Sequence, residues 1–367
     1  MNKFTVLYNP LAGKTDKAAI EAELSALLPD DELEYVVLGD GESYADVLKN
    51  VAPDRKIMLS GGDGTLNRFV NDPASDSYAG EIWYYASGNG NDFWTDLGRK
   101  KGDAPVDVTG YLKNLPLVTV NGVTRKFING IGYGIDGYCC EVGDKMRAEG
   151  KQNVNYAGIA IKGLLFFFKR ANAVVTVDGK EKSYKKVWLA PSMKGRYYGG
   201  GMEVAPAQNR NDDTLSLVVM HRSCKLKTLM VFPSIFKGEH VKHSEMVDVT
   251  VGKEISVRFD RPCALQIDGE TVLGVTEYSV RTASAASSGE SSLPAIERRR
   301  NRNGVKTHIR YKVLSTLYNR NHPEPSPYGS GVLLQRADEE RPIPCLTEMT
   351  SYLPAVAHRR EIPPQKK

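Results

Sequence analysis

The chain has 367 residues, 41% of them hydrophobic, so it can bury a sizeable core, and its length suggests about two domains. Its formal net charge of +5 permits attraction to anionic nucleotides or to an acidic membrane surface, but it is too small to argue for nucleic-acid binding. The five cysteines have no Cys-x-x-Cys spacing, so neither a zinc site nor a disulfide framework is indicated.

The sequence pattern near the N-terminus and along the apolar runs favours a cytoplasmic location. Residues 1–8 lack the apolar run and the cleavage site of a signal peptide, and they lead directly into a strand. The longest apolar run, residues 159–168, is interrupted by Lys162 and is shorter than the roughly 20 residues that span a bilayer. We therefore expect a cytoplasmic protein whose contact with a membrane is peripheral.

The first part of the chain alternates strands and helices. A strand at 4–8 precedes a helix with apolar residues at helical spacing, and a second strand and helix follow at 33–38 and 43–50. The third strand runs into a glycine-rich loop and a helix, and a fourth strand covers 82–86. This alternation predicts a doubly wound α/β domain over residues 1–116, with ligands at the carboxyl ends of its parallel strands.

From about residue 117 the pattern changes to β-hairpins. Asn121-Gly122 and Asp178-Gly179 each separate two strand-like runs, and these dipeptides form two-residue turns that match the twist of paired strands. We therefore expect an antiparallel β-sandwich domain over residues 117–283. Further strands are predicted at 214–220, 246–251, 254–259, 263–267 and 277–280, and helical insertions around 137–147, 155–170 and 225–236.

Two segments leave alternatives open. Residues 155–170 are interpreted as a core helix, and an interfacial helix that dips into lipid is the alternative. Residues 284–367 are interpreted as a disordered extension, because they bury too little apolar surface to offset the entropy of ordering them. For this extension the alternative is a basic tail that binds lipid headgroups.

The loop after the third strand has the chemistry of a phosphate cradle. Its glycines let the backbone approach an anion closely, and the start of the following helix supplies N–H donors. A carboxylate among them, Asp63, is unfavourable beside phosphates unless it holds a metal ion or takes up a proton, so catalysis is its simplest role. The alternative is a tight turn with Asp63 as the helix N-cap. The loop consists of Gly61, Gly62, Asp63, Gly64 and Thr65.

Two more loops follow strands of the same half, and a third feature lies near the end of the predicted β domain. The first loop carries Asn9, Pro10, Gly13 and Lys14, and the second carries Gly88, Asn91 and Asp92. Lys14 can supply the cation that the glycine-rich loop lacks. The distant feature is Asp268-Gly269-Glu270, which taken alone is a hairpin turn.

These loops resemble the diacylglycerol kinase catalytic-domain family, whose superfamily also holds sphingosine kinases and, more distantly, NAD kinases. The resemblance covers about residues 1–282. It departs at Arg68, where the family normally has glutamate, and at Asn89, where threonine is usual. Arg68 either adds a phosphate contact or marks an altered nucleotide site.

The resemblance implies a kinase that uses ATP and Mg²⁺, with the nucleotide between the two domains. Glu270 is then the expected general base for the lipid hydroxyl, and Asp63 is the rival base or the partner that organises the magnesium ion. Asp92 and Asp268 join Asp63 as predicted ligands of this ion, and Asn91 is expected to donate to a phosphate or ribose oxygen. The predicted nucleotide-binding residues are Asn9, Pro10, Gly13, Lys14, Gly61, Gly62, Asp63, Gly64, Thr65, Gly88, Asn91, Asp92 and Asp268.

Two further features follow from the same resemblance. Asp136, after a glycine-rich strand, either faces the hydroxyl of the acceptor substrate or caps the following helix. The loop at 195–213 resembles one that holds a structural magnesium in some relatives, but Thr214 replaces the customary glycine, which argues against that ion.

The sequence thus predicts an ATP- and Mg²⁺-dependent lipid kinase that phosphorylates a hydroxyl of diacylglycerol or a related lipid at a membrane surface. A kinase of a sphingoid or soluble acceptor is the first alternative, because a fold does not fix the acceptor. A nucleotide-binding protein without turnover is the second, and Arg68 and Asn89 favour it. No nucleic-acid partner is expected, and a homodimer stays open.

Overall fold

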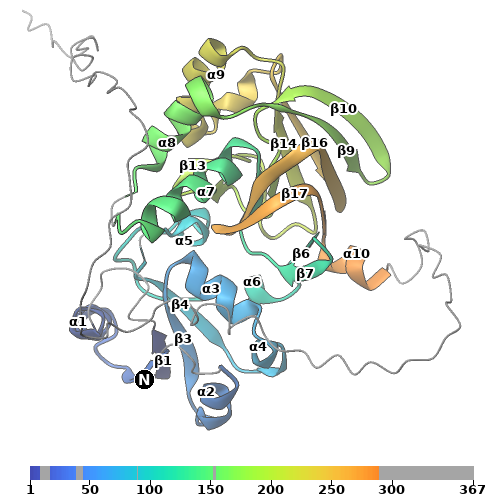
Figure 1. The fold of residues 1–367 in the computed structure, drawn as a ribbon. Coiled ribbons are helices and arrows are strands. Elements are labelled where there is room, and N and C mark those ends of the chain that lie inside the picture. Colours follow the sequence, from blue (N-terminus) through green and yellow to red (C-terminus); the bar gives the residue numbers. More distant parts are fainter. Residues whose placement is uncertain (9–16, 39–43, 89, 152–153, 289–367) are drawn as a thin grey trace, which may run out of the picture. The chain divides into compact units, whose positions relative to one another are not determined.

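The computed structural model describes residues 1–8, 17–38, 44–88, 90–151 and 154–288, which all belong to one unit of the chain, residues 1–296. They form a mostly parallel sheet with helices and a larger antiparallel sheet (Figure 1). The predicted fold class, an α/β part followed by an antiparallel β part, is confirmed. Among these residues, none of the helices combines the length and the apolar character that crossing a membrane requires.

The first sheet has the strand order β2-β1-β3-β4-β5. Its strands are β1 (Lys3–Tyr8), β2 (Glu32–Val37), β3 (Lys56–Gly61), β4 (Ile82–Ala86) and β5 (Val106–Asp107). The first four are parallel, and β5 pairs antiparallel with β4 at the edge. The carboxyl ends of β3 and β4 are therefore neighbours, with Gly61 opposite Ala86.

Helices cover both faces of this sheet because strand side chains alternate between the faces. On one face Phe4 and Val6 pack with Ile20 and Leu24 of the first helix. On the other, Leu7 lies in a cluster with residues of the second, third and fifth helices. The helices are α1 (Lys17–Leu27), α2 (Tyr44–Asn50), α3 (Asp63–Val70), α4 (Pro73–Ser77), α5 (Asp92–Asp96) and α6 (Thr109–Leu112).

The second sheet has the main order β15-β14-β11-β8-β16-β17-β6-β7, and the β9–β10 hairpin joins it at β16. Its strands are β6 (Leu117–Val120), β7 (Val123–Lys126), β8 (Gly130–Tyr133), β9 (Ala171–Val177), β10 (Lys180–Val187), β11 (Ser192–Met193), β14 (Leu215–Met220), β15 (Val247–Gly252), β16 (Glu254–Ile267) and β17 (Glu270–Arg281). A separate short pair is β12 (Tyr197–Tyr198) with β13 (Met202–Glu203).

Both predicted hairpin turns are confirmed. In the first turn Asn121 and Gly122 have φ of 50° and 77°, and in the second turn Asp178 and Gly179 have φ of 46° and 78°. Positive φ at both central positions is the geometry that Asn-Gly and Asp-Gly favour. The two strands predicted at 254–259 and 263–267 are instead one long strand, β16, with a register shift between Arg258 and Cys263.

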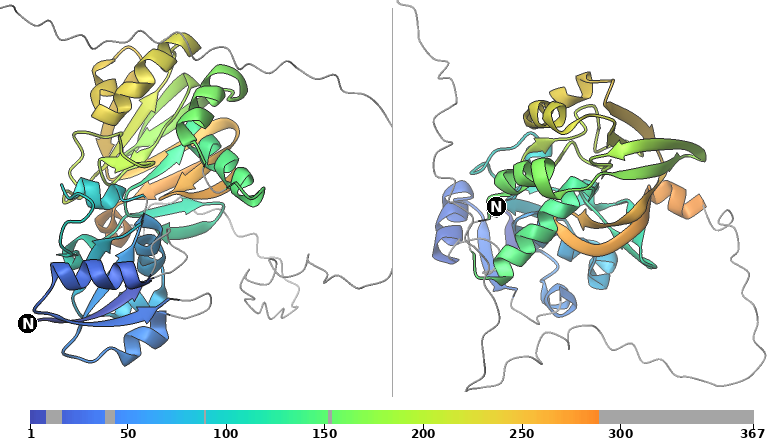
Figure 2. Two further views of the ribbon diagram at one scale, coloured as in Figure 1. Left: turned by 90° about the vertical axis from the view of Figure 1, so that its left-hand side faces the viewer. Right: turned by 45° about the horizontal axis from the view of Figure 1, so that its top comes forward.

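The helical insertions lie within the second half. Helix α7 packs on β8, β16 and β17 (Figure 2). The helices are α7 (Ile135–Ala148), α8 (Tyr156–Lys162), the π-helix η1 (Gly163–Phe167), α9 (Lys225–Val231), the 3-10 helices η2 (Phe232–Lys237) and η3 (Glu239–Lys242), and α10 (Ala283–Ser288). Helix α10 occupies the start of the predicted extension, and residues 289–367 lie outside the described residues.

The interpretation of residues 155–170 as a plain core helix is wrong. Leu164 and Phe168 are buried, but Phe166 and Phe167 are 72% and 63% exposed. The segment is helical only as far as Phe167, and its last turn is a π-helix, which changes the direction of the side chains. One side of this segment therefore belongs to the core and the other presents aromatic rings to solvent.

Candidate active site

Two glycine loops meet at the carboxyl ends of β3 and β4. A Cβ atom added to Gly88 would lie 2.5 Å from the Cα of Gly62, so only glycine permits this contact of backbone on backbone. Hydrogen bonds fix the approach: the N–H of Gly88 donates to the Gly61 carbonyl at 3.1 Å, and the N–H of Asp63 donates to the Gly90 carbonyl at 3.2 Å. At the first turn of α3, Gly64 has open space where a Cβ would lie. The loops form one surface of backbone beside the start of a helix.

Asp63 is a cap, but not of its own helix. Its carboxylate accepts hydrogen bonds from the backbone N–H groups of Asp92 at 2.8 Å and Phe93 at 3.1 Å, which are the first N–H groups of α5. Burial, and secondarily the nearby Asp92, raise the pKa of Asp63 to about 7. The alternative of Asp63 as N-cap of its own helix is wrong, because Gly62 holds that position and Asp63 contacts the start of α5 instead. Near neutral pH this carboxyl can be either charged or protonated.

Asp92 and Asp268 are held in the same manner by other segments. Asp92 accepts N–H bonds from Gly200 at 2.9 Å and Gly201 at 2.7 Å. Asp268 accepts a bond from the Asn67 amide at 2.7 Å and from three backbone N–H groups, those of Ile128 at 2.6 Å, Asn129 at 2.8 Å and Gly130 at 3.0 Å. Burial is the main cause that raises the pKa of each of these two carboxyls.

These contacts test the predicted magnesium site. Asp92 and Asp268 both raise the pKa of Asp63, so the three carboxylates lie near one another. Their oxygens, however, already accept N–H bonds, and no group of three or more His, Cys, Asp or Glu side chains in the described ranges is arranged to hold a metal ion. Mg²⁺ demands oxygen ligands in near-octahedral geometry. Since Mg²⁺ is commonly held by one or two carboxylates together with the phosphates of a substrate, its binding here stays a prediction.

Two polar side chains, those of Asn91 and Thr65, contact the glycine loops. Asn91 donates its side-chain amide to the Gly88 carbonyl at 2.8 Å, and its side-chain oxygen is buried without a partner among the described residues. An amide has two N–H donors, so the second remains for the predicted nucleotide contact. The hydroxyl of Thr65 lies close over Gly61, where a Cβ would be only 2.2 Å away. Asn9, Pro10, Gly13, Lys14 and the nearby Asn89 lie outside the described residues.

Glu270 begins β17 directly after the predicted turn, in which Asp268 and Gly269 have φ of 46° and 94°. Its carboxylate forms an ion pair with Arg125 of β7, and its side chain is 55% exposed. The other terminal nitrogen of Arg125, Nη2, is buried and has no hydrogen-bond partner within the described part of the chain. Glu270 follows Asp268 by two residues in the chain, and the contact that the structure gives its carboxylate is the one with Arg125. Sequence reasoning missed Arg125.

Asp136 lies in the first turn of α7. The hydroxyl of Tyr198 donates to its Oδ2 at 2.7 Å, a contact between two buried side chains that the sequence did not indicate. Burial raises the pKa of Asp136 to about 6, and the bond from Tyr198 acts in the opposite direction. Gly134 is the N-cap of α7 and no side chain caps the helix, so the cap alternative is wrong and the contact with the acceptor stays a prediction.

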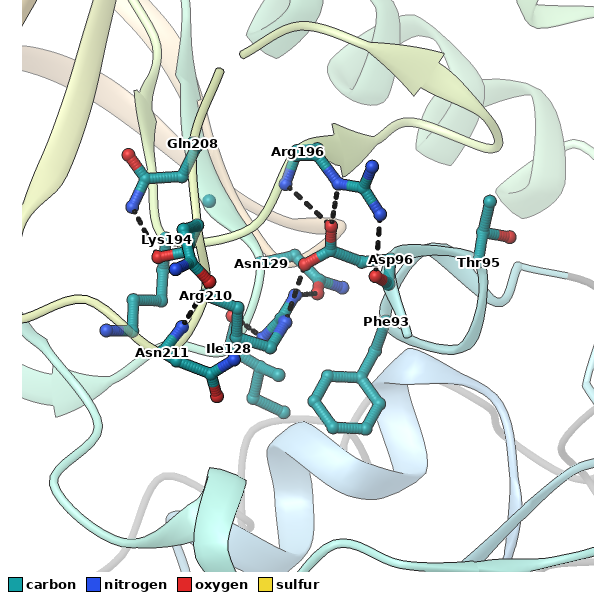
Figure 3. A network of polar contacts seen from close by, with 12 residues as sticks. Phe93, Thr95, Asp96, Ile128, Asn129, Lys194, Arg196, Gln208, Arg210 and Asn211 are labelled. Atoms are coloured by element: carbon teal, nitrogen blue, oxygen red, sulfur yellow. Dashed lines mark hydrogen bonds and ion pairs between the residues drawn. The ribbon is translucent and has the colours of Figure 1, made fainter. Parts of the chain in front are cut away.

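A buried ion-pair network joins α5 to the second half (Figure 3). One carboxylate oxygen of Asp96 accepts a hydrogen bond from Nε of Arg196 at 2.8 Å, and the other accepts one from Nε of Arg210 at 2.6 Å. Arg210 also donates to the Ile128 carbonyl at 2.7 Å and to the Asn129 side chain at 2.8 Å. Sequence reasoning missed this network, because its two arginines lie 100 and 114 residues after Asp96 in the chain.

Asp212 and Asp213, in the loop where the sequence argues against a structural magnesium, both contact lysines. The ammonium group of Lys194 donates to the Asp212 carbonyl at 2.7 Å. The Asp213 carboxylate pairs with Lys253 at 2.8 Å. Protein cations thus already contact both residues at this loop.

Two family models match consecutive parts of the chain. The diacylglycerol kinase catalytic domain matches residues 3–120, and the YegS C-terminal NAD kinase beta sandwich-like domain matches residues 129–285. The first range contains the parallel sheet with both glycine loops, and the second contains most of the antiparallel sheet with Glu270.

Individual relatives agree with these matches. The chain is 27% identical over 273 residues to a diacylglycerol kinase of Mycobacterium tuberculosis, covering 70% of this chain and 85% of that protein. It is 24% identical over 283 residues to a diacylglycerol kinase of Bacillus subtilis, covering 74% and 90%.

Solved structures share the fold. Two crystal structures from Bacillus anthracis str. Sterne superpose with TM-scores of 0.55 and 0.50 at 19% and 18% identity. Each alignment covers 77% of this chain, and 94% and 93% of the respective structures. Both family models match in order along the chain, so residues 3–120 are similar to the diacylglycerol kinase catalytic domain and residues 129–285 to the YegS C-terminal domain.

Proposed function

We propose that the chain is a lipid kinase that transfers the γ-phosphate of ATP to a hydroxyl of diacylglycerol or a related lipid. The observation that carries this proposal is the contact of two glycine loops, Gly61–Gly62 and Gly88–Gly90, beside the start of α3. Backbone that approaches so closely, next to the N–H groups of a helix start, is suited to the phosphates of a nucleotide. The names of the relatives support the choice of lipid.

The chain supplies a base for this reaction. Phosphoryl transfer needs the phosphates held, negative charge neutralised, and a group that accepts the proton of the attacking hydroxyl. Glu270 is our first candidate for this group, because its half-exposed carboxylate can reach an incoming acceptor and Arg125 holds it in place. Asp63 remains the rival, since its pKa of about 7 matches a base that works near neutral pH.

One experiment separates this proposal from its alternatives. The full chain is incubated with radiolabelled ATP, MgCl₂ and one of three acceptors: diacylglycerol in mixed micelles, sphingosine, or a soluble alcohol such as glycerol. We expect transfer to diacylglycerol. Preferred transfer to sphingosine or glycerol would move the assignment to the first alternative. ATP binding without transfer to any acceptor would favour the binding protein. Replacing MgCl₂ by EDTA tests the magnesium requirement.

Variants test the base. Glu270→Gln should lower kcat by about 100-fold or more while ATP still binds, because a general base contributes on that scale. Glu277→Gln is the matched control, since Glu277 is an exposed glutamate of the same strand. If only Asp63→Asn abolishes transfer and Glu270→Gln does not, the two carboxylates exchange roles.

The setting of the reaction is also part of the proposal. We expect the enzyme to act in the cytoplasm, to meet its lipid at a membrane surface and to bind no nucleic acid. Sedimentation velocity of the full chain tests whether it forms a homodimer.

A further inference from the structure

Apolar side chains gather on one exposed face of the second half. They come from α8, η1, α9 and η2, and we call them the α8–α9 face. Its members and their exposed fractions are Ile161 (45%), Phe166 (72%), Phe167 (63%), Leu226 (65%), Met230 (68%) and Phe236 (50%). Large exposed apolar groups are ordinary when scattered singly, but a contiguous set marks a contact surface.

The helices that carry these residues contact one another. Helix α9 packs against both η1 and η2, and α8 runs directly into η1. The ammonium group of Lys225, in the first turn of α9, donates to the Leu165 carbonyl of η1 at 2.6 Å. The rings of Phe166 and Phe167 are in contact, with centroids 6.2 Å apart. The helices that carry these apolar groups thus contact one another in the region where Figure 1 labels α8 and α9.

The core holds the rings of this face outward. A Cβ at Gly163 would lie 2.7 Å from the Tyr138 ring and 2.9 Å from Ile135, so glycine allows η1 to pack tightly on α7. On either side of the exposed pair, Leu164 and Phe168 are buried in the core. With these anchors on the inner side of the segment, Phe166 and Phe167 are left on the solvent side.

Basic residues dominate the charges near the face, although Glu239 lies just after η2 and Glu245 pairs with Lys227 of α9 at 2.7 Å. Residues 156–170 contain three Lys or Arg and residues 222–238 contain four, and neither segment contains Asp or Glu. Lys162, Lys169 and Lys237 are exposed. An apolar surface surrounded by lysines matches an anionic bilayer, in which acyl chains receive the rings while headgroups attract the cations.

The face also lies next to a predicted substrate residue. Helices α8 and η1 pack on α7, whose first turn carries Asp136. Tyr138, in the same turn, packs against the cluster that contains Leu164 and Phe168. A lipid that enters from this side would therefore meet the helix that carries Asp136.

We propose that the α8–α9 face docks the protein on an anionic lipid bilayer. The choice of a bilayer over another apolar partner rests on the proposed lipid kinase function, because a lipid acceptor must be taken from such a surface. The docking surface itself is assigned by exposure and charge alone.

Vesicle flotation tests the docking. The full chain is mixed with vesicles of phosphatidylcholine containing phosphatidylglycerol, and with vesicles of phosphatidylcholine alone. We expect binding to the anionic vesicles, lowered about tenfold or more by the double change Phe166→Ser and Phe167→Ser because two buried rings are lost. The control is Val251→Ser with Leu273→Ser, since these side chains are 56% and 59% exposed but lie on strands away from the face.

Lysine variants test the charge component. Lys162→Gln with Lys169→Gln should weaken binding to anionic vesicles by about fivefold or more, since each lysine near such a surface contributes on that scale. Their effect should disappear in high salt. The control is Lys100→Gln with Lys101→Gln, two exposed lysines of the α/β half. Circular dichroism of each variant checks that its fold is kept.

Three outcomes would overturn the docking proposal. The first is that the wild-type chain does not bind anionic vesicles. The second is that the phenylalanine variant and its control lose binding equally. The third is that the Phe166→Ser, Phe167→Ser protein binds vesicles as before but has changed from dimer to monomer. The last would make the face an interface between two copies. Transfer to a water-soluble short-chain diacylglycerol by the wild-type protein separates the two proposals: transfer without flotation rejects the docking alone, and flotation without transfer rejects the kinase alone.

Discussion

The three buried carboxylates Asp63, Asp92 and Asp268 each connect two segments of the chain. Each accepts hydrogen bonds from backbone N–H groups of a different element: Asp63 from α5, Asp92 from the loop at Gly200, and Asp268 from residues 128–130. A carboxylate held by such donors has a fixed orientation. These residues therefore shape the site even before any ligand is considered, and a change at one of them affects stability as well as chemistry.

The pKa of Asp63 makes stability depend on pH. The pKa of Asp63 in the folded chain, about 7, lies above the ordinary value of 3.8. Between about pH 4 and pH 7 the Asp63 carboxyl is therefore protonated more often in the folded chain than in the unfolded chain. Stability from this group is complete below about pH 4 and is lost as the pH rises through 7. In the wild-type chain this group lowers the unfolding free energy by up to about 1.4 kcal/mol for each pH unit of increase over this range. Asp63→Asn should remove this pH dependence.

Urea unfolding at several pH values measures this slope. Asp30→Asn, an exposed aspartate, is the control for the chemical change. An equal slope in the wild-type and Asp63→Asn proteins would show that the carboxyl keeps its ordinary pKa when folded.

The ion pair of Arg125 and Glu270 predicts coupled kinetics. If Arg125 acts by orienting the base, Arg125→Gln should lower kcat about tenfold with little change in KM. The double variant Arg125→Gln, Glu270→Gln should then be no slower than Glu270→Gln alone, because the group to be oriented is gone. Lys126→Gln, at the neighbouring position, is the control. Additive losses would assign Arg125 an independent role, for example on a phosphate.

The site residues differed in how far the sequence could identify them. Asp63 was singled out by its glycine-rich loop, whereas Asp92 and Asp268 were singled out through the resemblance to the kinase family. Arg125 was not found, because its contact with Glu270 depends on the order in which β7, β6 and β17 lie in the sheet. Long-range partners of this kind leave no local pattern in the sequence.

At the scale of elements, the contact between the two glycine loops can be tested by one matched pair. Gly88→Ala would place a Cβ 2.5 Å from the Gly62 backbone, whereas Gly90→Ala meets nothing within 4 Å. We expect Gly88→Ala to lower the unfolding free energy by about 1–3 kcal/mol, as overpacked sites do, and to weaken ATP binding. Gly90→Ala should change neither by much. Thermal unfolding and nucleotide titration measure both effects, and equal behaviour of the pair would contradict the close approach.

Element types were predicted better than element lengths. Alternating strands and helices gave the parallel sheet, and the Asn-Gly and Asp-Gly dipeptides gave the hairpins, because these signals are local. The full length of β17 was missed, since Gly274 with φ of 68° interrupts its pattern. The exposed side of residues 155–170 was missed because an apolar helix has the same sequence whether protein or solvent covers it.

At the scale of the whole described unit, polar contacts rather than a shared apolar core join the two halves. The apolar clusters are largely confined to one half each. Across the boundary run the bonds of Asp92 to Gly200 and Gly201, of Asp268 to Asn67, and of Asp96 to its two arginines. All of them begin or end next to the glycine loops, so the junction of the halves and the candidate site are the same region.

The two arginines on Asp96 should contribute unequally to this junction. The Arg210 side chain is 5% exposed and that of Arg196 is 33% exposed, while both pair with a carboxylate that is 2% exposed. Without Arg210 the buried Asp96 carboxylate loses the partner that solvent can least replace. Arg210→Ala should therefore lower the unfolding free energy by about 3 kcal/mol. Arg196→Ala should cost about 1 kcal/mol, since solvent screens its charge and can replace its bonds. Urea unfolding followed by circular dichroism measures both variants, and an equal or reversed order would mean that Arg210 is not what holds α5 to the second half.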